Sequence, residues 1–185
     1  YYGYTINPKS GGDLSSGNAN YIAHNFENTS LHKLVDQYNG AIDLCVSSYD
    51  VANNIEIFNT TTRAAKVRCN AIYNIVDLVK SKGDGVCFDI QKVPVKFKDQ
   101  YINMILDIDE RLNINADKEY EISVVIPSYD IGIPFNLNSD DYRILNEVVD
   151  TWIFQPSSSY DLSSDSIASV NIFSPFWDFN RIQKT

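Results

Sequence analysis

The chain of 185 residues is 44% hydrophobic and 12% aromatic, so it has enough length and apolar character to bury the core of one domain. Fifteen basic and twenty-four acidic residues give it a net charge of −9, which repels phosphate backbones, and we expect no nucleic-acid partner. No apolar run reaches the roughly eighteen residues of a membrane-spanning helix, so we expect no membrane span.

The N-terminal residues 1–20 read YYGYTINPKSGGDLSSGNAN and are polar and rich in Gly, Ser and Asn. This composition predicts a flexible N-terminal arm rather than a packed element. Because the chain begins with Tyr1 rather than Met, we also expect a processed or excised piece of a larger protein.

Residues 21–185 are expected to form a single domain in which helices and strands alternate. The predicted helices repeat apolar residues about every 3.6 positions, and the predicted strands are short, continuous apolar runs. In chain order these elements are a helix at 30–40, a strand at 41–48, a helix at 59–83, a strand at 83–91, a helix at 96–113, a strand at 120–128, a helix at 138–149, and strands at 149–156 and 169–179. We expect Ser30 and Ser139 to be N-caps. The alternation favours an α/β fold with parallel strands joined by crossover helices.

Polar residues follow the predicted strands at their carboxyl ends, where α/β sheets bind ligands. They are Ser47, Ser48, Tyr49 and Asp50, then Asp89 and Gln91, then Ser128, Tyr129 and Asp130, and finally Gln155. Two interpretations stay open at this point. The residues form a site, or they are polar only because strand ends emerge into water.

Three cysteines, Cys45, Cys69 and Cys87, cannot all pair within one chain, and none has the spacing of a zinc or redox motif. We expect them to be buried, apolar thiols. The sequence also lacks a phosphate-binding glycine loop, and we predict neither a cofactor nor a metal ion.

The run from CVSSYD at 45–50 to GDGVCFDIQ at 83–91 resembles the chitinase-like glycoside hydrolases of family 18, between their third and fourth barrel strands. In that family, a polar strand end is followed by a loop with Phe, a helix with Arg near its start, and the motif Asp-Gly-x-Asp-x-Asp-x-Glu. Phe58, Arg63 and the pair Asp84 and Gly85 stand in this order. VDTWIFQP at 149–156 is similar to the sixth strand, so the resemblance covers residues 41–156.

Several positions depart from the family pattern. The resemblance places the final Glu of the motif, which protonates the leaving oxygen during substrate-assisted cleavage, at Gln91. The middle Asp falls at Cys87, whereas the last Asp, which orients the acetamido group, is kept as Asp89. The Met and Tyr of the sixth strand fall at Gln155 and Ser157. An amide has no proton to transfer, so the resemblance implies a vestigial motif of Asp84, Cys87, Asp89 and Gln91 without a catalytic acid.

The resemblance implies an incomplete or divergent (β/α) TIM-barrel-like fold, because a complete barrel takes about 250 residues. Its open sheet edges would need cover from other domains of a larger parent protein or from a second copy of the chain. We therefore expect a non-catalytic chitinase-like domain that acts as a scaffold or interaction module, in an extracytoplasmic location at the cell surface or outside the cell.

Two other functions stay open. The first is a module that binds glycans containing N-acetylglucosamine through Tyr49, Asp89, Gln91, Tyr129, Gln155 and Trp177. Trp152 could also stack on a sugar, although both tryptophans are more typical of a core. The second is a weak glycoside hydrolase that uses Asp50, Asp130 or Asp161 as its acid.

Overall fold

The computed structural model describes residues 3–16, 29–114, 116–126 and 137–154. Within them, one six-stranded sheet has the order β2-β1-β3-β4-β5-β6. The strands are β1(Gly3–Asn7), β2(Asp13–Ser16), β3(Asp43–Ser48), β4(Gly85–Ile90), β5(Glu121–Ile126) and β6(Thr151–Phe154). Neighbouring strands from β1 to β6 are parallel, and only β2 runs antiparallel, beside β1. The predicted α/β class with parallel strands is therefore confirmed, and an open sheet of this kind is consistent with an incomplete barrel.

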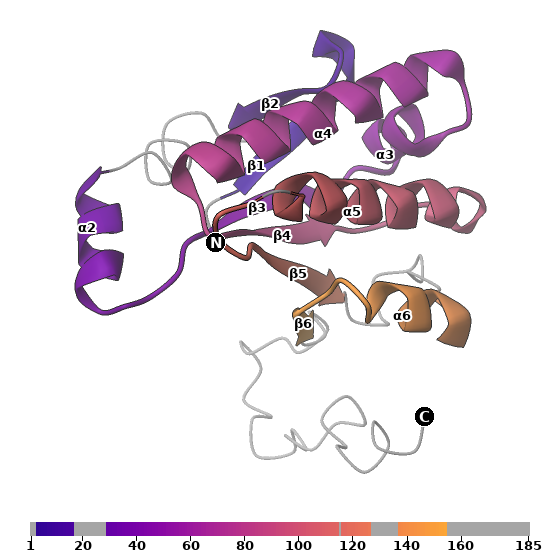
Figure 1. The fold of residues 1–185 in the computed structure, drawn as a ribbon. Helices are drawn as coiled ribbons and strands as arrows, with labels where there is room; N and C mark the ends of the chain where they lie inside the picture. The colour runs from indigo at the N-terminus through magenta and orange to yellow at the C-terminus, as the bar shows by residue number, and fades with distance from the viewer. Residues whose placement is uncertain (1–2, 17–28, 115, 127–136, 155–185) are drawn as a thin grey trace, which may run out of the picture.

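The helices are α2(Thr29–Gln37), α3(Val51–Phe58), α4(Thr62–Lys82), α5(Lys98–Asn113) and α6(Ser139–Leu145), with short 3-10 turns at η1(Pro8–Ser10) and η2(Val95–Phe97). The two longest, α4 and α5, lie side by side across one face of the sheet (Figure 1). None of the helices in the described part of the chain combines the length and apolar character required to cross a bilayer.

Both faces of the central strands are buried, which explains their continuous apolar sequence. Side chains alternate between the two faces of a strand. In β4, Val86, Phe88 and Ile90 join the main core, whereas Cys87 packs in a separate cluster with Cys45 and Val125. All six residues of β4 are buried, so this strand is the centre of the sheet.

The prediction of a flexible arm at residues 1–20 was wrong for residues 3–16, which form a hairpin at the edge of the sheet. β1 pairs in parallel with β3, and Tyr4 and Ile6 are buried in the main core. These two apolar residues alternate with polar ones, a strand pattern that the surrounding Gly, Ser and Asn concealed. A turn containing Gly11 and Gly12, both with positive φ, reverses the chain into β2.

The helix α3 was also not predicted, and Phe58 lies in it rather than in the loop that the resemblance implied. Asp50 caps α3 because its carboxylate accepts a hydrogen bond of 2.8 Å from the backbone N–H of Asn53. Ile57 and Phe58 are fully buried, and the Phe58 ring packs edge-on against Tyr101 of α5. Burial of these two side chains stabilises a helix too short to be stable alone.

The predicted N-caps need correction at two helices. α2 begins at Thr29, so Ser30 lies inside it. Asn138, not Ser139, caps α6, since its side chain accepts hydrogen bonds from the backbone of Asp140 and Asp141. The Asp141 carboxylate in turn accepts the N–H of Asn138, which completes a capping box. The strand expected at 169–179 lies outside the described residues.

The hairpin turn makes a testable contrast between its two glycines. A Cβ at Gly12 would lie 2.2 Å from the backbone oxygen of Val67 in α4, whereas one at Gly11 would meet no atom closer than 3.9 Å. Both residues have positive φ. We expect Gly11→Ala to lower the free energy of unfolding by about 1 kcal/mol and Gly12→Ala by about 3 kcal/mol or more, because only the latter also forces backbones apart. Urea denaturation measures both, and equal losses would contradict this packing of the turn.

Candidate functional site

The candidate site lies at the carboxyl end of β4, where the segment GDGVCFDIQ ends. Asp89 is 2% exposed and Gln91 is 5% exposed. Asp89 stands beside Ser47 of β3, and Cys87 stands beside Cys45 in the row below. Because Cys87, Asp89 and Gln91 alternate with the core residues of β4, all three belong to the sheet face opposite α4 and α5. The structure thus brings three residues of the motif together.

The Asp89 carboxylate is satisfied by two neighbouring side chains. The amide Nε2 of Gln91 donates a hydrogen bond of 2.9 Å to Oδ1 of Asp89, and the hydroxyl of Tyr49 donates to Oδ2. Burial together with the adjacent carboxylate raises the pKa of Tyr49, so its phenol stays protonated as a donor. The buried carboxylate therefore has a partner on each oxygen, as a desolvated charge requires.

The backbone of Gln91 is fixed on both sides. Its N–H donates to the carbonyl of Ser48 at 2.8 Å, and its carbonyl accepts a hydrogen bond of 2.5 Å from Nδ2 of Asn54. Asn54 is fully buried within α3, and its role was not predicted from the sequence. The available signal was that Asn54 lies three and four residues before the apolar Ile57 and Phe58, a spacing that places it on their face of a helix.

Cys87, which the resemblance aligns with an acid of the family motif, packs beside a second thiol, Cys45. Cys87 and Cys45 are hydrogen-bonded to each other, and this contact together with burial raises the pKa of Cys87. Both side chains are buried, as predicted, but Cys69 is exposed, so the prediction for this third cysteine was wrong. Cys69 lies on the solvent side of α4, where the helix period exposes it.

Asp84, the first residue of the motif, lies at the opposite end of β4 from Asp89. Its carboxylate accepts hydrogen bonds from the backbone N–H of Ile42 at 2.9 Å and from Nζ of Lys118 at 2.7 Å. Partial burial alone would raise the pKa of Asp84, but these two donors outweigh it and lower the pKa. Asp84 thus ties together the starts of three strands and does not belong to the site.

Other candidate residues fall into two groups. Six of them lie outside the described residues: Tyr129, Asp130, Gln155, Ser157, Asp161 and Trp177. Trp152 packs against α6, where its ring contacts Tyr142 and its Nε1 donates to Asn146 at 2.9 Å. The Asp50 carboxylate caps α3.

No group of acidic, histidine or cysteine side chains suited to a metal ion occurs in the part of the chain that the structure describes.

Solved structures with a similar fold are chitinases and related glycosylases. The fold matches a protein described as a sporulation-specific glycosylase of Bacillus subtilis with a TM-score of 0.64 and 18% identity, over 86% of this chain and 49% of the other. It matches the spore cortex-lytic enzyme SleL of Bacillus megaterium with a TM-score of 0.61 and 16% identity, over 83% of this chain and 34% of the other. It also matches a chitinase of Chromobacterium violaceum with a TM-score of 0.60 and 16% identity, over 89% of this chain and 50% of the other.

These likenesses confirm the resemblance to chitinase-like proteins at the level of the fold. No protein-family model and no curated protein sequence matches the chain. The chain spans between a third and a half of the length of these three solved proteins. A fold can carry many functions, so the activity of this chain has to be argued from its own site.

The bond between Tyr49 and Asp89 can be tested by stability. Tyr49→Phe leaves one oxygen of a buried carboxylate without its donor, so we expect the free energy of unfolding to fall by about 1–2 kcal/mol at pH 7. Because the pKa of Tyr49 is raised on folding, the hydrogen bond stabilises the protein below pH 10 and is lost above it. The difference between the two proteins should shrink above about pH 10.

The matched control for this measurement is Tyr38→Phe, since Tyr38 is 72% exposed. This variant should stay within about 0.5 kcal/mol of the original protein. A Tyr49→Phe variant as stable as the Tyr38→Phe control would show that the phenol does not support Asp89.

Proposed function

We propose that this chain is a non-catalytic, chitinase-like domain that serves as a scaffold or interaction module. The observation that carries the proposal is the hydrogen bond from Gln91 to Asp89. The resemblance to family 18 puts the catalytic acid at Gln91, and a side-chain amide has no proton that it can transfer at neutral pH. At this position the chain therefore has a donor that holds a carboxylate in place instead of an acid that cleaves a bond.

The surroundings of Gln91 support the same proposal. In the family, the neighbouring carboxylates govern the charge of the acid, but here Cys87 stands in the place of one of them and is hydrogen-bonded to Cys45. Each oxygen of Asp89 already accepts a hydrogen bond from a side chain of this chain, so the carboxylate is held in place by its own neighbours. This arrangement stabilises the end of β4, and among the described residues around Gln91 no carboxylic acid stands in the place of the general acid.

The partner of such a module would be found at the sheet edges. β6 has β5 on one side and no second neighbour among the described strands. An unpaired parallel edge invites further pairing, and the solved proteins with this fold are at least twice as long as the segment that matches them. We propose that other domains of a parent protein or a second copy of the chain cover this edge, in an extracytoplasmic setting.

The absence of catalysis is tested with a chromogenic chitobioside. We expect the purified chain to release no chromophore above the uncatalysed rate, because the general acid, worth about 10²–10⁴-fold, is missing. An active chitinase serves as the assay control. Turnover by this chain that disappears in an Asp89→Ala variant would contradict the proposal.

Glycan binding is a second candidate, favoured by Tyr49. This ring is 50% exposed although its hydroxyl is anchored to a buried carboxylate, and a fixed aromatic face of this kind can stack on a sugar. The test is tryptophan and tyrosine fluorescence during titration with N-acetylglucosamine oligomers. A glycan-binding module predicts a saturable change that Tyr49→Ala abolishes and the exposed control Tyr38→Ala preserves. If the fluorescence does not change up to millimolar sugar, glycan binding is rejected and only the scaffold proposal remains.

A further inference from the structure

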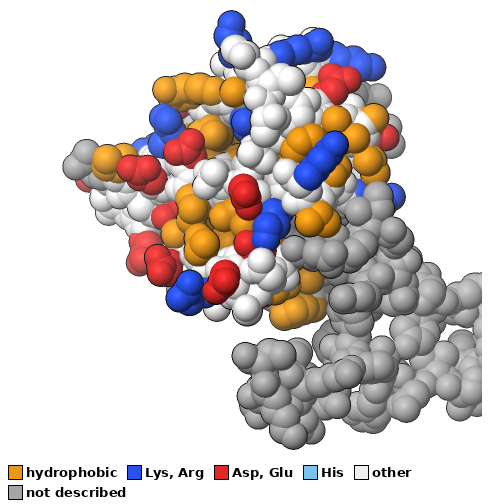
Figure 2. Space-filling model, turned by 90° about the vertical axis from the view of Figure 1, so that its right-hand side faces the viewer, with side chains coloured by type: hydrophobic (Ala, Val, Ile, Leu, Met, Phe, Trp, Pro, Cys, Tyr) orange, Lys and Arg blue, Asp and Glu red, His pale blue; other side chains and the backbone are white. Residues whose placement is uncertain are grey.

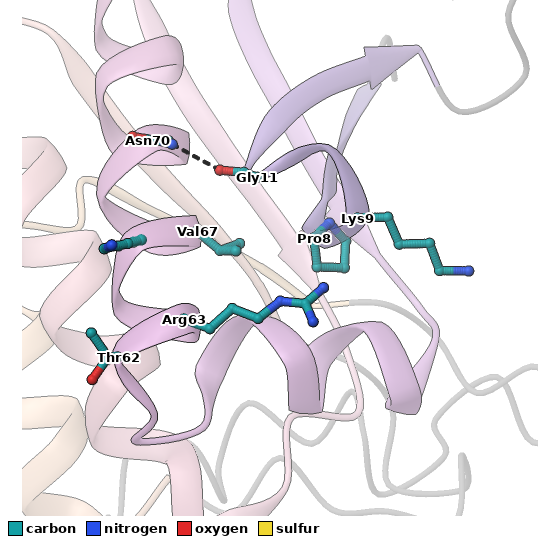
Figure 3. Close-up of a pocket in the computed structure, with 8 residues that line it drawn as sticks. Pro8, Lys9, Gly11, Thr62, Arg63, Val67 and Asn70 are labelled. Atoms are coloured by element: carbon teal, nitrogen blue, oxygen red, sulfur yellow. Dashed lines mark hydrogen bonds between the residues drawn. The ribbon is translucent and has the colours of Figure 1, made fainter.

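A cleft of about 540 Å³ lies between the η1 turn and the first turns of α4, on the helix-covered side of the protein. Its wall includes Pro8, Lys9, Arg63, Lys66, Val67 and Asn70. In Figure 3, Arg63 extends from α4 toward the η1 turn, whereas Lys9 projects from that turn away from α4. The vestigial motif on β4 contributes no residue to this cleft.

The two walls of the cleft are held together by direct contacts. Nδ2 of Asn70 donates a hydrogen bond of 3.0 Å to the carbonyl of Gly11, and Nδ2 of Asn74 donates to the carbonyl of Gly12 at 3.4 Å. Gly12 approaches the backbone of Val67 so closely that no side chain would fit there. The hairpin is therefore fixed against α4, and the cleft exists before any ligand arrives.

The charge of this cleft is opposite to that of the protein. Lys9, Arg63 and Lys66 line it, and no acidic side chain is among its described lining residues, although the chain carries a net charge of −9. Glu56 would compete with a bound anion for Arg63, because its carboxylate lies 3.8 Å from Nη2 of Arg63. An exposed pair at this distance is weak, so an incoming anion can replace Glu56.

We propose that the cleft binds a small sugar-sized ligand that carries an anionic group such as a phosphate monoester. The guanidinium of Arg63 can bind two oxygens of the anion, and the long side chains of Lys9 and Lys66 add positive charge. The cleft also lies at the N-terminus of a helix of 21 residues, whose dipole favours an anion.

The size of the ligand follows from the shape and chemistry of the cleft. A volume of about 540 Å³ lies within the range of small-molecule sites and exceeds what a lone inorganic anion fills. Pro8 and Val67 supply apolar surface for the uncharged part of the ligand. The inference does not depend on the proposed function, since it uses a different face of the sheet and different residues.

The test uses isothermal titration calorimetry on the full chain at low ionic strength. The probes are glucose 6-phosphate, inorganic phosphate and glucose. We expect saturable binding of glucose 6-phosphate, weaker binding of inorganic phosphate and none of glucose. Equal affinity for glucose 6-phosphate and phosphate, or no saturation by glucose 6-phosphate at millimolar concentration, would overturn the proposal.

Three variants assign the binding to this cleft. Lys9→Gln combined with Arg63→Gln should weaken glucose 6-phosphate binding about tenfold or more, because charge-assisted hydrogen bonds are lost. Glu56→Gln should tighten binding about twofold to threefold, since the competing carboxylate is removed. Lys80→Gln, in the last turn of α4, removes the same charge outside the cleft and should change the affinity less than twofold. If the double variant and Lys80→Gln lose the same affinity for glucose 6-phosphate, the loss comes from the change in net charge, and the site is rejected.

Discussion

The burial of Asp89 is the constraint on which the candidate site depends. A carboxylate removed from water is costly unless both oxygens accept hydrogen bonds, and here Gln91 and Tyr49 provide them. This requirement ties together two successive strand ends, because Tyr49 follows β3 and Gln91 follows β4. Asn54 extends the network into α3 by holding the carbonyl of Gln91. Asp89 and Gln91 are thus part of the framework of the sheet, as the scaffold proposal requires.

A second constraint acts at the other side of the sheet, where the hairpin meets α4. β1 must place Tyr4 and Ile6 in the core, and the turn that follows must pass close to the backbone of α4 at Gly12. The same close approach leaves Lys9 and Arg63 on either side of a cleft. One packing contact therefore completes the sheet edge and creates the basic site proposed for an anionic ligand. The two sites lie on different faces of the molecule and draw on different residues.

Much of the fold could be predicted from periodicity. The helix α4 was recognised from apolar residues spaced near 3.6 positions, and β4 from an apolar run bounded by Gly83 and the polar residues after it. The hairpin was missed because Tyr4 and Ile6 are isolated among residues typical of loops. Phe58 was misplaced because α3 is short, and its stability comes from packing against Tyr101 rather than from local sequence.

The sequence by itself determined the α/β class, the order of the central elements and the presence of an amide rather than an acid at Gln91, because these depend on local pattern and residue identity. Only the tertiary structure decided that Gln91 and Tyr49 both donate to Asp89, that Cys87 stands opposite Cys45, and that Asp84 lies at the far end of the strand. The physical reason is that strand register and the packing of the helices set distances between residues far apart in the chain. Local sequence patterns carry no information about those distances.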